Sequence, residues 1–293
     1  MKPAKFDYVA PESLDEAIAL LAANPDDAQI IAGGQSLTPM LNFRMAGAAL
    51  LIDINRIVGL SGIRLGDDGA VHIGATTRHR DVELSPLVAR HLPLVHAAMP
   101  YVAHVAVRNR GTIGGSLCLA EPSAEWPALC IACEAEIVLA SPRGRRRVTA
   151  EEFPLAPYTT SREEDEILEE VIFPAWPANR RFGFEEVSRR AGDFAIIGIA
   201  SVLDLGTDRR INAARIVAFG LGDRALLLDA PSAALLGRVP EEAAVAAAIA
   251  CADEGLEFDS DFHASAAYRR RLVQRLVGRT LRAALGIKTE QDG

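Results

Sequence analysis

The spacing of apolar residues changes along this chain, and the first change marks the end of a first structural unit. After an S-x-x-E capping box made by Ser13 and Glu16, apolar residues recur three and four positions apart, which predicts a helix with one buried face. The apolar runs at residues 29–31 and 50–54 have the length of short buried strands, and a helical stretch separates them. The order helix, strand, helix, strand predicts a small parallel α/β unit.

From residue 63 onward, short strands alternate with helices. A helix is expected over residues 86–99, because its first residue is a proline, which is favoured in a first helical turn. Strands of a second sheet are expected at residues 134–140, 147–150 and 166–173. The segment 174–179 contains two prolines and cannot continue a strand or a helix, so it is predicted to be a linker.

Beyond the linker the pattern predicts three strands followed by three helices. The strands are expected at residues 182–187, 194–205 and 211–221, and the longest helix at residues 266–285. With 293 residues and a typical domain of ~150, the chain is expected to form two domains.

Composition and charge narrow the classes of protein to which this chain can belong. Hydrophobic residues make up 49% and charged residues 24%, the balance of a soluble globular protein. The formal charge of −8 argues against a nucleic-acid binder, and the basic run at residues 143–147 is interpreted as a solvated turn. No stretch reaches the ~18 apolar residues of a membrane span, and the first residues lack the apolar core of a signal peptide, so a cytoplasmic protein is expected.

The four cysteines offer one motif, a C-x-x-C formed by Cys130 and Cys133. Such a pair can bind a metal or undergo redox chemistry. Apolar residues surround it and no second pair follows, so a buried helix is favoured and no metal ligand is predicted.

Two glycine-rich loops are the informative chemical features. The first, Ala-Gly-Gly-Gln-Ser at residues 32–36, follows a predicted strand, and the second, Gly-Thr-Ile-Gly-Gly-Ser, covers residues 111–116. Paired glycines allow a backbone to approach a ligand closely, and successive N–H groups can form a nest for phosphate. Each loop alone is more typical of a structural turn than of a ligand site. A G-x-G-x-x-A match at residues 220–225 lacks the helix and second strand of a dinucleotide fingerprint and is interpreted as a strand-end turn.

Three ordered motifs give the chain a family resemblance. The first loop, continuing into Leu37-Thr38-Pro39, is similar to an A-G-G-x-[SD]-L-x-P segment, and the second to a T-[IV]-G-G-N segment. Residues 188–195, Ser-Arg-Arg-Ala-Gly-Asp-Phe-Ala, resemble a third marker. The chain thus resembles the FAD-binding medium subunits of the xanthine dehydrogenase and carbon monoxide dehydrogenase family, and the resemblance covers nearly its whole length.

The resemblance implies an α+β fold in two domains. A two-lobed FAD-binding domain of the vanillyl-alcohol oxidase type is expected at residues 1–175, with lobes of about 1–58 and 59–175. A smaller C-terminal domain of the CO dehydrogenase flavoprotein type is expected at residues 180–286, and a disordered tail at residues 287–293.

The resemblance also assigns a cofactor site. The two loops are implied to hold the FAD diphosphate and are therefore expected to lie together; Glu125 is implied to bind the sugar or adenosine part, Ile167 to lie against the adenine, and Phe194 to approach the flavin ring. The full set of implied FAD-binding residues is Ile31, Ala32, Gly33, Gly34, Gln35, Ser36, Leu37, Gly111, Thr112, Gly114, Gly115, Ser116, Glu125, Ile167 and Phe194.

Three departures from the family pattern bear on that site. Ser116 stands where asparagine is usual, and Glu125 is one methylene longer than the usual aspartate. Glu185 and Glu186 stand where many relatives carry a lysine near the flavin. A carboxylate there is expected to disfavour an anionic reduced flavin.

The implied function is an oxidoreductase subunit without a catalytic side chain of its own. Electrons would come from [2Fe–2S] clusters on a small partner subunit, a large partner would hold the molybdenum cofactor, and the complex would be a dimer of heterotrimers. Two alternatives remain open: a stand-alone flavin oxidase or reductase on the same fold, and a cofactor-free scaffold. The sequence names neither the substrate nor the final acceptor, because the oxidised molecule would meet a different subunit.

Overall fold

The first unit is a small parallel sheet built as the sequence pattern predicts. The computed structural model describes residues 2–288. Strands β1 (Asp7–Val9), β2 (Ala28–Ile31) and β3 (Leu50–Asp53) pair in the order β1-β3-β2, all parallel. Helix α1 (Leu14–Ala23) begins at the Ser13 cap and buries Ala17, Ile18 and Leu21, while α2 (Leu37–Asn42) follows the first glycine loop. A 3-10 turn, η1 (Ile54–Arg56), follows β3.

A five-stranded antiparallel sheet forms the second unit. Its order is β4-β5-β10-β6-β7. The strands are β4 (Ile63–Leu65), β5 (Val71–Gly74), β6 (Glu136–Ser141), β7 (Gly144–Thr149) and β10 (Ile167–Phe173), and a small hairpin adds β8 (Pro154–Ala156) and β9 (Thr159–Thr160).

Six short helices connect β5 to β6. They are α3 (His79–Leu84), α4 (Pro86–His91), α5 (Pro93–Ala98), α6 (Val105–Arg108), α7 (Ile113–Leu119) and α8 (Glu125–Ala132). The prediction of one continuous helix over residues 86–99 was wrong. The chain leaves the helical conformation at Leu92 (φ −137°, ψ 60°), because the ring of Pro93 disfavours a helical residue before it.

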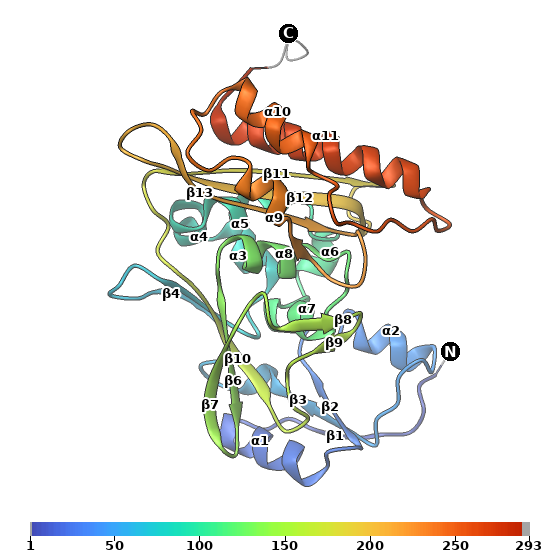
Figure 1. Cartoon of the computed structure of the whole chain (residues 1–293). Helices are drawn as coiled ribbons and strands as arrows, with labels where there is room; N and C mark the ends of the chain where they lie inside the picture. Colours follow the sequence, from blue (N-terminus) through green and yellow to red (C-terminus); the bar gives the residue numbers. More distant parts are fainter. Residues whose placement is uncertain (1, 289–293) are drawn as a thin grey trace.

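The last unit is a four-stranded antiparallel sheet between two layers of helices. Strands β11 (Arg180–Ser188), β12 (Ala195–Leu205), β13 (Ile211–Phe219) and β14 (Leu226–Leu227) pair in chain order. Helices α9 (Asp229–Ala233), α10 (Glu242–Ala250) and α11 (Ala266–Leu285) follow, and α10 and α11 cover one face of the sheet (Figure 1). The predicted disordered tail at residues 287–293 lies, from residue 289, outside the described residues.

The other face of this sheet packs on helices of the second unit. Val202, Val217 and Phe219 share one buried apolar cluster with Trp126 and Leu129 of α8, whereas Ile197 and Leu203 point into a second cluster with α11. The arrangement of α3 to α8 below the sheet and α11 above it is visible in Figure 1. A continuous apolar core therefore joins the two parts of the chain.

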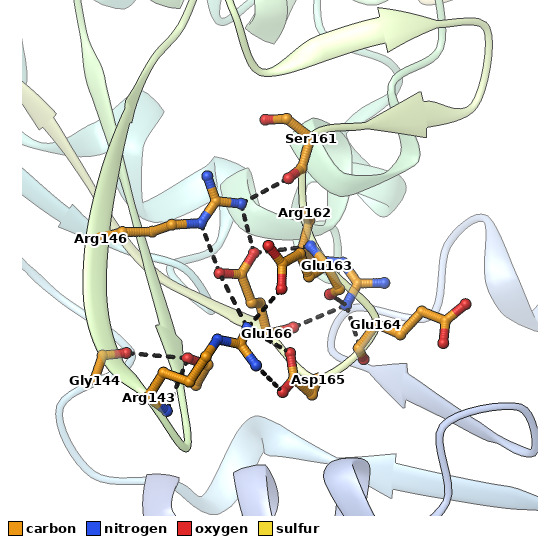
Figure 2. A network of polar contacts seen from close by, with 10 residues as sticks. Arg143, Gly144, Arg146, Ser161, Arg162, Glu163, Glu164, Asp165 and Glu166 are labelled. Atoms are coloured by element: carbon orange, nitrogen blue, oxygen red, sulfur yellow. Dashed lines mark hydrogen bonds and ion pairs between the residues drawn. The ribbon is translucent and has the colours of Figure 1, made fainter.

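The basic run at residues 143–147 is mostly strand, so its interpretation as a solvated turn was wrong for residues 144–147. Arg143 contacts Glu163 and Asp165, and Arg146 makes two hydrogen bonds of 2.7 Å with the Glu166 carboxylate (Figure 2). These contacts tie β7 to the segment that leads into β10. The run is an ion-paired sheet edge, and its charge is neutralised by neighbouring carboxylates.

Candidate FAD site

The two glycine loops touch each other, as the sequence predicted. A Cβ built on Gly33 would lie 2.3 Å from the carbonyl oxygen of Arg110 and 2.9 Å from the Cα of Gly111. No side chain fits in that space, so the close approach requires glycine at position 33. The first loop joins β2 to α2, and the second begins between α6 and α7 and continues from Ile113 as the first turns of α7.

The first loop carries unpaired backbone donors. Gly34 has a left-handed conformation (φ 69°), which turns the chain into α2. The N–H groups of Gly34, Gln35 and Ser36 donate no hydrogen bond within the described residues, and the Ser36 hydroxyl does not cap α2. Successive free N–H groups in a tight turn form a concave anion-binding surface. The loop therefore fits one side of a diphosphate.

The second loop offers fewer free donors. The N–H of Gly111 binds the carbonyl of Val107, that of Gly114 the carbonyl of Ala75, and that of Gly115 the hydroxyl of Thr112. A Cβ on Gly114 would lie 2.8 Å from the carbonyl oxygen of Ala75. The glycines of this loop thus serve close packing, and its half-buried Ser116 retains a hydroxyl.

The side chains of Asn55 and Arg78, which sequence reasoning missed, form a polar clamp that connects the two loops. The amide of Asn55 donates to the Ala32 carbonyl at 2.8 Å and accepts from Arg78 at 2.6 Å. The other Arg78 nitrogen donates to the Arg110 carbonyl, which closes the connection between the loops. Asp53, which accepts from the Tyr8 hydroxyl at 2.5 Å, accepts from the Asn55 backbone at 2.9 Å.

Two buried carboxyl groups lie where the two domains meet. Glu125 begins α8 and is only 4% exposed, and burial raises its pKa to about 7. Glu186 lies on β11, and its Oε2 is buried without a hydrogen-bond partner. Burial, and to a smaller extent the charge of Glu125, raise the pKa of Glu186 to about 8. Near neutral pH Glu186 is therefore mostly protonated, which weakens the negative field that the sequence suggested at this position.

Glu185 differs from its neighbour. Its carboxylate pairs with Arg279 of α11 at 2.9 Å, and Arg279 lowers its pKa against the stronger opposing effect of burial. The two adjacent glutamates therefore have different environments, one facing α11 and one near α8.

The remaining predicted residues are spread more widely. Phe194 precedes β12 and is 59% exposed, in a loop whose Gly192 packs against His104 of the first domain. Ile167 is 1% exposed and packs in the apolar core of the first unit with Ile52 and Ile54. Its side chain has almost no exposed surface, so its contact with adenine stays a prediction. Ile31 and Leu37 are half-buried at the two ends of the first loop.

Two expectations about other chemistry can be compared with the described residues. Cys130 and Cys133 are buried and free, Cys130 in α8 and Cys133 at its end, which agrees with the buried-helix interpretation. Residues 2–288 contain no group of three or more side chains arranged to hold a metal ion. In the same residues, no helix is both long and apolar enough to cross a bilayer.

Comparison with known proteins identifies the family. Residues 4–176 match the family described as the FAD binding domain in molybdopterin dehydrogenase, and residues 182–284 match the CO dehydrogenase flavoprotein C-terminal domain. The chain belongs to this flavoprotein family. It is thus an FAD-binding subunit of the molybdenum hydroxylase dehydrogenases, as the sequence motifs predicted.

Relatives match over almost the full length. The alpha subunit of the 6-hydroxypseudooxynicotine dehydrogenase complex of Paenarthrobacter nicotinovorans is 40% identical over 285 residues, covering 97% of this chain and 96% of that protein. The carbon monoxide dehydrogenase medium chain of Hydrogenophaga pseudoflava is 39% identical over 284 residues, covering 97% and 98%. These relatives are subunits of larger dehydrogenases.

Solved structures share the whole fold. Carbon monoxide dehydrogenase from Hydrogenophaga pseudoflava contains a chain that superposes with a TM-score of 0.94 at 40% identity, covering 99% of this chain and 100% of that one. A chain of quinoline 2-oxidoreductase from Pseudomonas putida 86 gives 0.92 at 38% identity, with 98% and 99% covered. The predicted α+β fold, with its FAD-binding and C-terminal domains, is confirmed.

Proposed function

We propose that this chain carries electrons within a molybdenum-dependent dehydrogenase. It would receive them from [2Fe–2S] clusters on a small subunit and pass them to an external acceptor, while a large subunit with the molybdenum cofactor oxidises the substrate. The contact between the two glycine loops, with free N–H groups on one of them, is the observation that supports a bound dinucleotide best. A bound flavin would store the electrons, and the chain would supply its position and electrostatic surroundings.

The cysteines support a separate iron–sulfur subunit. Two [2Fe–2S] clusters need four ligands each, usually thiolates, and the chain has four cysteines in total. Two of these are buried together at α8, where burial raises the pKa of both thiols. Electrons must therefore enter through a protein interface. We propose a heterotrimer, duplicated into a dimer, in the cytoplasm.

We also propose which residues bind each part of the cofactor. The loops at residues 32–36 and 111–116 would hold the diphosphate, and Glu125 would receive a hydroxyl or amino group of the adenosine part. Phe194, exposed at the edge of the C-terminal domain, would lie near the flavin ring. We place the domain boundaries at residues 1–175 and 180–286.

Purification from native cells under mild conditions tests this function. A tag on this chain should co-purify one large and one small subunit, together with flavin, molybdenum and iron in a fixed ratio. A monomer that reduces its own flavin with a small substrate, at a rate unchanged by added partners, would support the stand-alone oxidase instead.

A further inference from the structure

Arg78 and Arg110 are two guanidinium groups beside the glycine loops that lack carboxylate partners. Within residues 2–288, neither forms a salt bridge, although arginines elsewhere, such as Arg143 and Arg146, are paired. The Arg110 side chain is exposed and donates no hydrogen bond in this part of the chain, while its own carbonyl accepts from Arg78.

The two positive charges act on each other. Burial lowers the pKa of Arg78 most, the charge of Arg110 lowers it next, and the more weakly acting Asp81 and Asp53 raise it. Two positive charges held together form a local region of positive electrostatic potential in a protein whose net charge is −8. This repulsion would be relieved by an anion between the loops.

The hydrogen-bond pattern shows why such an anion needs side-chain charge. A diphosphate carries two negative charges, and among residues 2–288 the first loop supplies free N–H groups that include those of Gly34, Gln35 and Ser36. The second loop has its N–H groups at Gly111, Gly114 and Gly115 already paired inside the protein. Backbone donors alone therefore cover one side of the ligand.

We propose that Arg78 and Arg110 are the counter-charges of the FAD diphosphate. Arg110, on the exposed side, attracts it by charge. Arg78 adds charge and, through its hydrogen bonds to Asn55 and to the Arg110 carbonyl, fixes the distance between the loops. This inference rests on FAD occupying the two loops, as proposed above.

A titration of the flavin-free full chain with FAD tests the inference, with flavin fluorescence as the readout and potassium chloride varied from about 20 to 300 mM. Arg110→Gln should weaken binding about fivefold and Arg78→Gln about tenfold or more, and both should flatten the rise of Kd with salt. Arg78→Lys keeps the positive charge but cannot donate to both Asn55 and the Arg110 carbonyl as the guanidinium does. This variant should therefore keep the wild-type salt dependence and still bind FAD more weakly than wild type. Arg271→Gln, on an exposed position of α11, is the matched control and should behave as wild type.

The outcomes separate the two claims. Wild type that fails to bind FAD would overturn the proposed function itself. Wild type that binds FAD, with Arg78→Gln and Arg110→Gln matching Arg271→Gln in both affinity and salt dependence, would overturn only the role of the arginines. Because the exposed Arg110 side chain makes no hydrogen bond or salt bridge within residues 2–288, its variant keeps the test valid even where Arg78→Gln folds poorly.

Discussion

At the scale of single residues, the site depends on Gly33, because glycine has no Cβ. Gly33 brings the first loop so near the second that a methyl group would overlap the Arg110 carbonyl. A steric overlap with backbone cannot be relieved by turning a side chain, so one loop must move. The distance between the loops, and hence the width available to a diphosphate, follows from this contact.

Gly33→Ala should therefore reduce FAD affinity more than tenfold and destabilise the chain by about 1–3 kcal/mol. Gly222→Ala is the matched control, since a Cβ there would meet nothing within 4 Å. Equilibrium FAD titration and urea denaturation of the two variants measure both effects. Equal affinity of Gly33→Ala and Gly222→Ala would contradict the tight contact between the loops.

The two buried carboxyl groups make stability depend on pH. The pKa of Glu125 is raised to about 7 and that of Glu186 to about 8, so the folded chain holds protons that the unfolded chain has lost above about pH 4.5. The stability they contribute is therefore greatest at low pH and falls as the pH rises toward 8. Glu186→Gln should remove part of this slope and raise the free energy of unfolding at pH 8 by about 1–2 kcal/mol, allowing for the partial exposure of the group.

Urea denaturation of the full chain at pH 5 through 9 measures this slope. Glu185→Gln is a useful comparison, because burial also raises the pKa of Glu185 but Arg279 opposes that effect, so its removal should reduce the slope less than Glu186→Gln does. A Glu186→Gln chain with the wild-type slope would show that the carboxyl pair is ionised or solvated in the folded state.

Sequence reasoning found the glycine loops and missed the residues that hold them. Paired glycines after a strand are a local signal, readable from a few neighbouring positions. Asn55, Arg78 and Arg110 come from three distant segments, and polar residues in loops follow no period that would connect them. Such a clamp becomes visible only when the fold brings the segments together.

At the scale of elements, β7 forms ion pairs of unequal burial with the segment before β10 and with β6. Glu166 is 1% exposed and is bound by Arg146, whereas the pair of Arg147 with Glu136 has side chains that are 61% and 43% exposed. A charge left unpaired inside a protein costs far more than a surface pair contributes.

Arg146→Gln should therefore lower the free energy of unfolding by about 1–3 kcal/mol, and Arg147→Gln by less than about 1 kcal/mol. Thermal and urea denaturation of the two variants give the comparison, since Arg147 directly follows Arg146 (Figure 2) on the same strand. Equal losses of unfolding free energy in the two variants would mean that the Glu166 carboxylate stays hydrated in the folded chain.

The elements themselves were predicted where a long apolar pattern existed. Three strands of the C-terminal sheet and helix α11 appear close to their expected places, because each has a regular period over many residues, whereas the two-residue strand β14 was not predicted. The three-residue strand β1 was not predicted, since its pairing with β3 and not its own sequence defines it. The break at Leu92 was missed although Pro93 is a local signal for it.

At the scale of the whole molecule, the C-terminal sheet packs between the helices of the FAD-binding domain and helix α11. The C-terminal sheet is buried on one face by α11 and on the other by α8, which begins with Glu125. Gly220 at the end of β13 donates to the carbonyl of Pro122, just before α8. Glu125, a predicted residue of the candidate FAD site, thus lies where the two domains pack together, which sequence patterns within either domain could not reveal.

The phosphorus NMR spectrum of FAD bound to the full chain tests the central claim most directly, because the two loops are assigned to the diphosphate and to no other part of the cofactor. On one-to-one binding, both phosphorus resonances should shift and broaden, and Gly33→Ala should reverse much of that change. Bound FAD whose phosphorus resonances stay at the positions of the free cofactor would contradict the account, since its diphosphate would then lie outside the two glycine loops.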